Sequence, residues 1–230
     1  MKTQVFNVLI IFAVISFFSL SSHATDSGYE GLLLSPAKKI NSYSLMDHTG
    51  KPIDFPESNG HMKFVFFGYA NCPDVCPMTL IKVKKLIQAL GEEANDLDFY
   101  FVSIDPQRDN KDQLKKYVAN YGTRITGITG EPHPLKELEN EFGILTRKFQ
   151  GKSAFAYTLE HSVFIYLLDQ QGYLRIMYPA STSISAIVND IEKGTGHKKL
   201  IDGNIKPRFP IYIYIPTVCF IFIEIIIVEC

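Results

Sequence analysis

Two cysteines separated by three residues are the part of the sequence best suited to do chemistry. They lie in "FFGYANCPDVCPMTL", residues 66–80, as Cys72 and Cys76, between an apolar run and a segment with helical spacing. A thiolate is a nucleophile, a redox centre and a soft metal ligand. The pair therefore allows three interpretations: a structural disulfide, a redox-active dithiol, or part of a metal site.

The surrounding pattern places this pair between a strand and a helix. Residues 63–69, "KFVFFGY", are apolar and β-prone throughout, as in strands covered on both faces. Four apolar residues after the cysteines recur at helical spacing: Leu80, Val83, Ile87 and Leu90. Gly91 then suits a helix stop. We expect Cys72 just before the helix and Cys76 in its first turn, where exposed N–H groups and the helix dipole favour thiolate.

The residues alone weaken some interpretations of the pair without deciding between them. A bridge that closes only three residues removes little entropy from the unfolded chain, so it would stabilise the fold weakly. A thioredoxin-type pair has two spacer residues rather than three. A thiol peroxidase has Thr three residues before its reactive cysteine, where this chain has Pro73 before Cys76. Two soft thiolates suit Cu(I), and an added imidazole gives a three-coordinate site that also tolerates Cu(II).

A histidine would have to complete such a metal site. Among the six histidines, His161 is the one that immediately precedes an expected buried strand, in "YTLEHSVFIYLLD", residues 157–169. In a thioredoxin-like sheet, the loop before that strand lies beside the redox loop. His161 is therefore the candidate third ligand, and the competing interpretation is a structural or solvated histidine. The others fall in the amino-terminal segment, a turn, two loops and the region after the last helix: His23, His48, His61, His133 and His197.

The remaining patterns predict an α/β domain. We expect two short strands joined by a turn in residues 42–55, and an antiparallel hairpin around residues 170–172. A further strand is expected at 97–105, and helices at 111–121, 134–143 and 183–194. This alternation, closed by a hairpin and a helix, predicts a central mixed sheet flanked by helices on both faces, with a β-hairpin near its amino end.

Composition narrows the function classes. Lys and Arg number 23 against 24 Asp and Glu, so the net charge is −1, and no long basic stripe exists to collect phosphates. We therefore expect no nucleic-acid partner. Four cysteines are too few for a scaffold held by disulfides. With 230 residues, 46% of them hydrophobic, the chain can bury one sizeable core.

Both ends of the chain differ from the middle in amino-acid composition. Residues 1–24 have the layout of a secretory signal peptide, with an uncleaved membrane anchor as the alternative. We expect a linker at 25–40, the folded domain at 41–200 and an Ile- and aromatic-rich tail at 201–230. The tail contains Cys219 and Cys230, which we do not assign as ligands, and its role is left open. The basic residues from Lys198 to Arg208 oppose a membrane-spanning interpretation of this tail.

Four segments carry a resemblance to a known family. They are "DHTGKP" (47–52), "FFGYANCPDVCP" (66–77), "VSIDPQRD" (102–109) and "YTLEHSVFIYLLD" (157–169), in that order. The chain resembles the SCO/SenC copper chaperones, thioredoxin-fold proteins that help assemble cytochrome c oxidase. The resemblance covers roughly residues 40–195. The Ile-rich tail has no counterpart in the family pattern.

The resemblance implies a site and a function. Cys72, Cys76 and His161 would bind one copper ion, as Cu(I) or Cu(II), and the protein would be a metallochaperone rather than an enzyme. It would deliver copper to subunit II of cytochrome c oxidase or another exported acceptor, or reduce that subunit's cysteines. An exported thiol-disulfide reductase that uses the same dithiol is the alternative. Glu160 stands where the family commonly has Asp, and Ala156 stands where it frequently has an acid. Both lie outside the ligand set, so these departures affect how neighbouring residues adjust the copper site more than whether copper binds.

The resemblance and the amino-terminal segment also bear on location and partners. We expect an exported protein, in the bacterial periplasm, with membrane anchoring as a variant of that expectation. Its site of action would lie near the membrane that holds the oxidase. Because exported cysteine pairs become oxidised unless something keeps them reduced, an upstream copper donor and a thiol reductant are expected partners.

Overall fold

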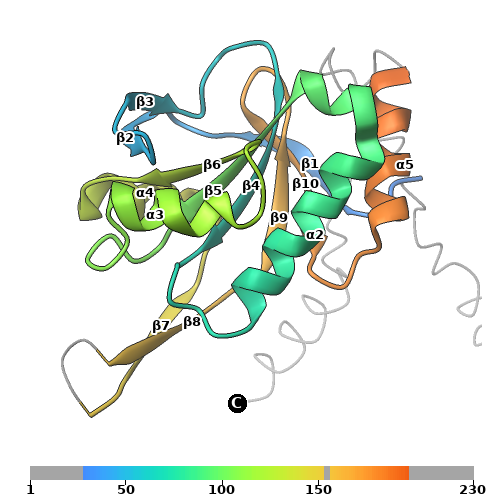
Figure 1. Ribbon diagram of the computed structural model, residues 1–230. Helices are drawn as coiled ribbons and strands as arrows, with labels where there is room; N and C mark the ends of the chain where they lie inside the picture. Colours follow the sequence, from blue (N-terminus) through green and yellow to red (C-terminus); the bar gives the residue numbers. More distant parts are fainter. Residues whose placement is uncertain (1–27, 153–155, 197–230) are drawn as a thin grey trace, which may run out of the picture.

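An eight-stranded mixed sheet forms the centre of the protein (Figure 1). The computed structural model describes residues 28–152 and 156–196. The strands follow one another across the sheet in the order β1 (Leu32–Lys39), β10 (Tyr173–Pro179), β9 (Phe164–Leu168), β4 (Met62–Gly68), β5 (Leu97–Ser103), β6 (Ile125–Thr129), β2 (Tyr43–Asp47) and β3 (Pro52–Phe55).

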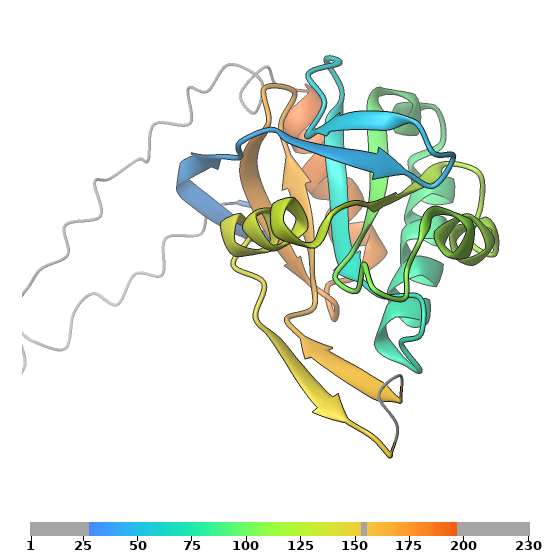
Figure 2. The same cartoon turned by 90° about the vertical axis from the view of Figure 1, so that its left-hand side faces the viewer.

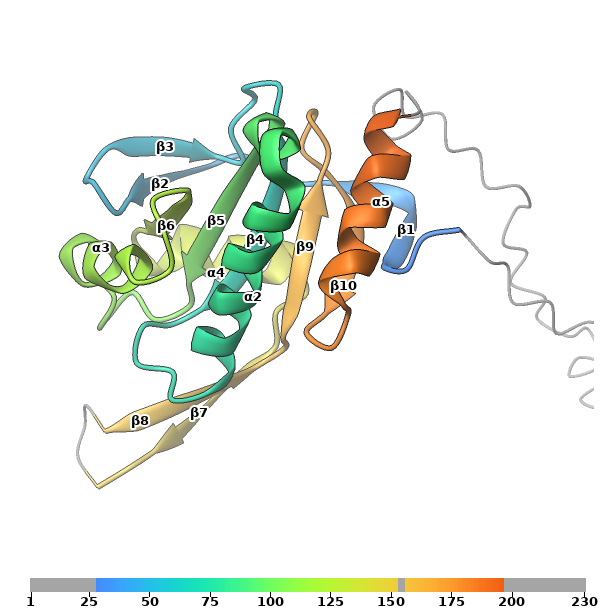
Figure 3. The same ribbon diagram turned by 45° about the vertical axis from the view of Figure 1, so that its right-hand side comes forward.

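Helices cover both faces of this sheet, as the sequence predicts. They are α2 (Val75–Leu90), α3 (Lys111–Ala119), α4 (Pro132–Glu141) and α5 (Ile184–Gly196), with a short 3-10 helix η1 (Gly91–Asp96). Helices α2 and α5 lie side by side on one face, and α4 lies on the other (Figures 2 and 3). Strand β4 pairs parallel to β5 and antiparallel to β9, so it is central, and all seven of its residues are buried.

Part of the expected linker is a strand. Residues 25–40 were expected to be irregular, but β1 forms within them and pairs antiparallel with β10. The register of this pairing shifts between Leu33 and Lys38, around Pro36. Buried and exposed residues therefore do not alternate regularly along the strand. Ile40 directly after it is 2% exposed and belongs to the core. The linker prediction is therefore wrong for this strand, because edge pairing rather than local pattern creates it.

The amino-terminal hairpin is confirmed. Strands β2 and β3 pair antiparallel, with Leu45 opposite Ile53, and both of these residues are buried. The turn between them is closed by Asp47, whose Oδ1 accepts hydrogen bonds from the backbone N–H groups of Thr49 and Lys51. Strand β2 also pairs with β6, so the hairpin continues the central sheet.

A second, two-stranded sheet projects from the body. It consists of β7 (Thr146–Gln150) and β8 (Tyr157–His161), which pair antiparallel (Figures 1 and 3). Four of the five residues of β7 are exposed. The sequence patterns did not predict this hairpin, because it lacks the apolar runs of the central strands. An isolated two-stranded hairpin is marginally stable in water, so this one needs contacts with the body.

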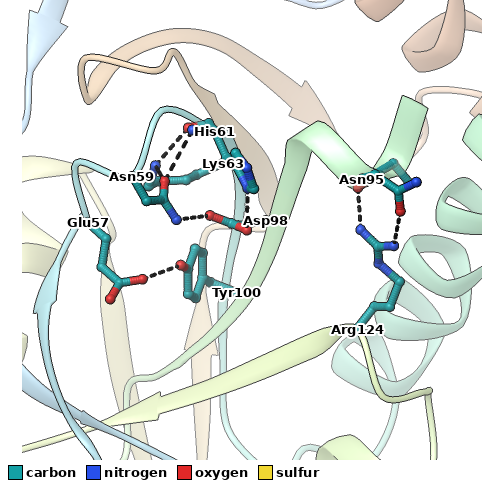
Figure 4. Close-up of polar contacts among 9 residues, drawn as sticks. Glu57, Asn59, His61, Lys63, Asn95, Asp98, Tyr100 and Arg124 are labelled. Atoms are coloured by element: carbon teal, nitrogen blue, oxygen red, sulfur yellow. Dashed lines mark hydrogen bonds and ion pairs between the residues drawn. The ribbon is translucent and has the colours of Figure 1, made fainter. Parts of the chain in front are cut away.

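A polar cluster lies at the amino ends of β4 and β5, away from the cysteines (Figure 4). The Lys63 side chain is buried and donates hydrogen bonds to the Asn59 side chain, at 2.9 Å, and to the His61 carbonyl, at 2.7 Å. Burial lowers the pKa of Lys63. Asp98 accepts from the Asn59 amide at 2.7 Å and lies 3.2 Å from the His61 ring. This cluster anchors the loop that precedes β4.

The predictions for the two ends lie outside the described residues. The structure does not describe residues 1–27, which contain the whole expected leader, or residues 197–230, which contain the hydrophobic tail with Cys219 and Cys230. Among the helices that the structure describes, none has the length and apolar character needed to cross a membrane. The domain boundaries therefore stay predictions, apart from strand β1.

Candidate metal centre

The two cysteines lie where strand β4 passes into helix α2. Cys72 is in the connecting loop, where its backbone N–H donates to the Tyr69 carbonyl at 3.1 Å. Cys76 is the second residue of α2 and is fully buried. The Cys76 backbone N–H donates to the Cys72 sulfur at 3.4 Å. The start of the helix therefore directs a hydrogen-bond donor at the first cysteine, as expected from the sequence.

The two thiols differ in their affinity for a proton. Both are free rather than joined in a disulfide. A hydrogen bond from the Cys76 thiol, helped by backbone N–H groups, lowers the pKa of Cys72 to about 3. The same hydrogen bond, together with burial, raises the pKa of Cys76. Cys72 is therefore a thiolate at neutral pH, and Cys76 holds the shared proton.

His161 reaches this pair from the end of strand β8. Its Nδ1 lies 2.9 Å from the Ser162 carbonyl oxygen, and its Nε2 lies 3.6 Å from the Cys76 sulfur. Because a carbonyl can only accept, Nδ1 must carry the ring proton. The lone pair of Nε2 is then available on the side that faces Cys76. Metal-binding histidines usually have this arrangement, with the other ring nitrogen donating to a fixed acceptor.

The spacing of sulfur and nitrogen fits a shared ion. For a closed-shell ion such as Zn²⁺, bonds of about 2.3 Å to sulfur and about 2.0 Å to nitrogen place the two ligand atoms about 3.5 to 3.7 Å apart. Cys76 and His161 have this spacing. Nevertheless, within residues 28–152 and 156–196 no three His, Cys, Asp or Glu side chains already form a complete ligand group. Cys72 is the second sulfur beside this pair, and it accepts from the Cys76 backbone N–H at 3.4 Å.

The other described histidines are engaged elsewhere or exposed. His48 Nδ1 accepts from the Gly127 backbone N–H at 3.0 Å, and His61 contacts Asp98 (Figure 4). His133 was expected in a loop but lies in the first turn of α4, with an 84% exposed side chain. His23 and His197 lie outside the described residues. Of the histidines that the structure describes, His161 is therefore the one placed to join the cysteines.

Comparisons with known proteins identify the family of this chain. Residues 33–196 match the SCO1/SenC family. The chain belongs to the SCO1/SenC family. An SCO2-like protein of Rickettsia typhi is 28% identical to this SCO1/SenC protein over 188 residues, which cover 77% of this chain and 93% of the relative.

Solved structures of copper-bound relatives have the same fold. Bradyrhizobium japonicum ScoI with copper bound superposes with a TM-score of 0.63 at 26% identity, covering 67% of this chain and 98% of that one. Arabidopsis thaliana ScoI with copper bound gives a TM-score of 0.63 at 25% identity, covering 68% of this chain and 97% of that one. The thioredoxin-like fold expected from the resemblance is thus confirmed, and homologous structures contain copper.

The absence of a side chain at Gly68 lets Cys76 pack against the sheet of this SCO1/SenC protein. A methyl group at this position would lie 2.8 Å from the Cys76 sulfur and 2.8 Å from the Phe101 ring. We therefore expect Gly68→Ala to lower the free energy of unfolding by about 1–3 kcal/mol, the usual cost of overpacking, and to change the reactivity of Cys76. Urea unfolding and thiol alkylation rates check this. Wild-type values for both would contradict the packing described here.

Sequence reasoning missed the side chains that support the site in the SCO1/SenC protein. Asp109 is fully buried, and its Oδ2 accepts from the Ala70 backbone N–H at 3.0 Å and from the Ser103 hydroxyl at 2.8 Å. Burial raises the pKa of Asp109 to about 6. The available signal was an Asp-x-x-Arg-Asp cluster, residues 105–109, directly after a buried strand. Polar residues in that place favour a functional role, but the pattern does not say which contacts they make.

Proposed function

We propose that this protein carries one copper ion on Cys72, Cys76 and His161. It delivers the ion to the binuclear copper site of cytochrome c oxidase subunit II, or to another exported acceptor. The observation that carries this proposal is the 3.6 Å separation between Cys76 Sγ and His161 Nε2, two residues 85 positions apart in sequence. The copper-bound relatives and the family membership support it. The recipient follows from what the family does rather than from contacts in this chain.

The residues have distinct roles in binding the cargo. Cys72 is a thiolate before the metal arrives and is the first soft ligand that Cu(I) meets. Cys76 must release its proton when it binds the ion, so loading should free a proton. His161 adds a neutral nitrogen through Nε2. Residues 73–75, at the end of the loop and the start of α2, are exposed, so a partner's ligands can reach the copper and replace these three one at a time.

A thiol-disulfide reductase is the second candidate function. The observation in its favour is the Cys72 thiolate, since a low thiol pKa increases the fraction able to attack a disulfide. Such a reaction would oxidise Cys72 and Cys76 to a disulfide and reduce the substrate's disulfide to two thiols. The disulfide form cannot bind copper through these sulfurs. Copper transport and dithiol exchange are therefore alternative states of one motif, and we favour the carrier because His161 is present.

The proposed carrier works outside the cytoplasm. We expect export to the bacterial periplasm, close to the membrane that contains the oxidase, and this expectation rests on residues 1–24 of the sequence and on bacterial relatives. An oxidising compartment converts an unprotected cysteine pair to a disulfide. The carrier therefore needs an exported thiol reductant as well as a copper donor.

Copper loading in the two redox states tests the proposal. The reduced full-length protein, incubated with excess Cu(I) without oxygen and desalted, should retain one copper per chain. Protein oxidised to the Cys72–Cys76 disulfide should retain almost none. If the reduced protein kept no copper while it reduced a model disulfide readily, the reductase function would replace the carrier function.

A further inference from the structure

The hairpin that carries His161 depends on the body for its position. It is a separate two-stranded sheet whose outer strand β7 is largely exposed (Figure 1). Its inner strand β8 alternates, with Tyr157 buried, Leu159 and His161 half-buried, and the two residues between them exposed. These three side chains therefore share the face that points to the body. A contact that fixes Tyr157 therefore also fixes the direction of the His161 side chain.

Arg108 makes the contacts that fix Tyr157. Its guanidinium lies over the Tyr157 ring, 3.5 Å from the centroid, and its Nη1 donates to the Tyr157 carbonyl at 2.9 Å. Its Nε pairs with Asp105 Oδ2 at 2.5 Å, and the Tyr157 hydroxyl donates to Asp105 Oδ1 at 2.6 Å. The Arg108 and Asp105 side chains are only 12% and 4% exposed. Arg108 therefore contacts both the backbone and the ring of Tyr157 from a largely buried position.

A second contact holds the middle of the same strand. The Leu159 backbone N–H donates to the Tyr69 hydroxyl at 3.2 Å, and Arg108 also lies over the Tyr69 ring, at 5.6 Å. The Tyr69 ring in turn stands edge-on to the His161 ring, with centroids 6.4 Å apart. A slip of β8 by one residue would turn His161 away from the cysteines, because side chains alternate between faces. The contacts of Arg108 and Tyr69 oppose that slip.

One short turn therefore reaches both halves of the site. The backbone N–H groups of Arg108 and Asp109 donate to the Asp105 carbonyl at 3.1 and 2.9 Å, which closes the turn. Asp109 then holds the cysteine loop through the Ala70 N–H, while Arg108 holds the histidine hairpin through Tyr157. Along the chain, the two ligand-bearing segments are far apart, because Cys76 and His161 are separated by 85 positions. This turn supplies a much shorter structural connection between them.

We infer that Arg108 is the positioning residue of the copper site: it holds strand β8 in the register that brings His161 Nε2 to Cys76. This inference rests on the proposed carrier function. It concerns how firmly His161 is held in place rather than which atoms bind the copper. Loss of a supporting residue around a metal ligand typically lowers metal affinity about 10-fold to 100-fold.

The test compares Arg108→Gln with a matched arginine variant. Arg124→Gln removes hydrogen bonds to the Asn95 side chain and the Ala94 carbonyl, far from the cysteines (Figure 4). Cu(I) affinity of the reduced full-length proteins is measured by competition with a chelator. We expect Arg108→Gln to bind copper about 10-fold to 100-fold more weakly than wild type, and Arg124→Gln to match wild type. X-ray absorption of the loaded Arg108→Gln protein should show a weakened nitrogen contribution with both sulfurs retained.

Two further variants make the test specific. Arg108→Lys keeps the charge but not the planar fork, so we expect it to restore little of the lost affinity. Tyr157→Phe keeps the ring and removes only the hydroxyl contact with Asp105. We therefore expect a smaller loss of Cu(I) affinity than in Arg108→Gln. If Arg108→Gln does not fold, Tyr157→Phe provides the test, and wild-type affinity in it would overturn the inference. Unchanged copper affinity in Arg108→Gln, or a loss that leaves the nitrogen contribution intact, overturns the inference. Failure of the wild type to bind copper would instead refute the proposed function.

Discussion

Serine at position 72 or 76 is expected to abolish copper retention by the reduced protein. Each substitution removes one of two soft thiolates, and a hydroxyl is a poor ligand for Cu(I). Copper per chain should fall from one to nearly zero in Cys72→Ser and in Cys76→Ser, measured after anaerobic loading and desalting. Cys76→Ser should also raise the pKa of Cys72, because the Cys76 thiol is the largest cause of its depression.

Cys219→Ser is the matched control for these two variants. Cys219 lies in the apolar tail, outside the described residues, and we assign it no role in binding. It should load one copper, like the wild type. Full copper retention by either Cys72→Ser or Cys76→Ser would remove the basis of the proposed site, whatever the control does.

Alanine at position 161 is expected to separate copper retention from dithiol chemistry. The change deletes the nitrogen that lies 3.6 Å from Cys76 Sγ but leaves both sulfurs in place. Copper affinity should fall by about 100-fold or more, above the loss expected from a supporting residue alone. The rate at which the dithiol reduces a model disulfide should stay within a few-fold of wild type, because that reaction uses only the two cysteines.

His133→Ala is the control for this experiment. His133 is exposed on α4, and its Nε2 lies 3.8 Å from Glu137 on its own helix. It should keep wild-type copper affinity and wild-type dithiol exchange. If His161→Ala retained wild-type affinity, the site would consist of the two sulfurs alone and His161 would have a structural role.

The sequence patterns predicted the elements whose signals are local. The buried run of β4, the apolar spacing of α2 and the stop at Gly91 place the cysteines correctly, and the glycine takes a φ of 56° at the helix end. These features depend on residues next to one another, so periodicity reveals them. The hairpin β2–β3 and the pair β9–β10 were predicted for the same reason.

The patterns failed where pairing or burial is created by distant residues. Strand β6, "ITGIT", is short and was not predicted, although its neighbour β5 makes it a buried strand. Strands β7 and β8 are short and lack the continuous apolar run of the central strands, so they were not recognised. His161 was expected just before a buried strand, but it is the last residue of β8, a separate strand two residues before β9. The role of Arg108 was invisible because its main partner, Tyr157, is 49 residues away.

X-ray absorption of the reduced, copper-loaded wild type beside His161→Ala tests the ligand set of the copper site. We expect one copper per chain with two sulfur ligands and one nitrogen ligand in the wild type. In His161→Ala, the nitrogen contribution should disappear while both sulfur contributions stay. A wild-type spectrum without a nitrogen ligand, or one that His161→Ala leaves unchanged, would contradict a site made of Cys72, Cys76 and His161.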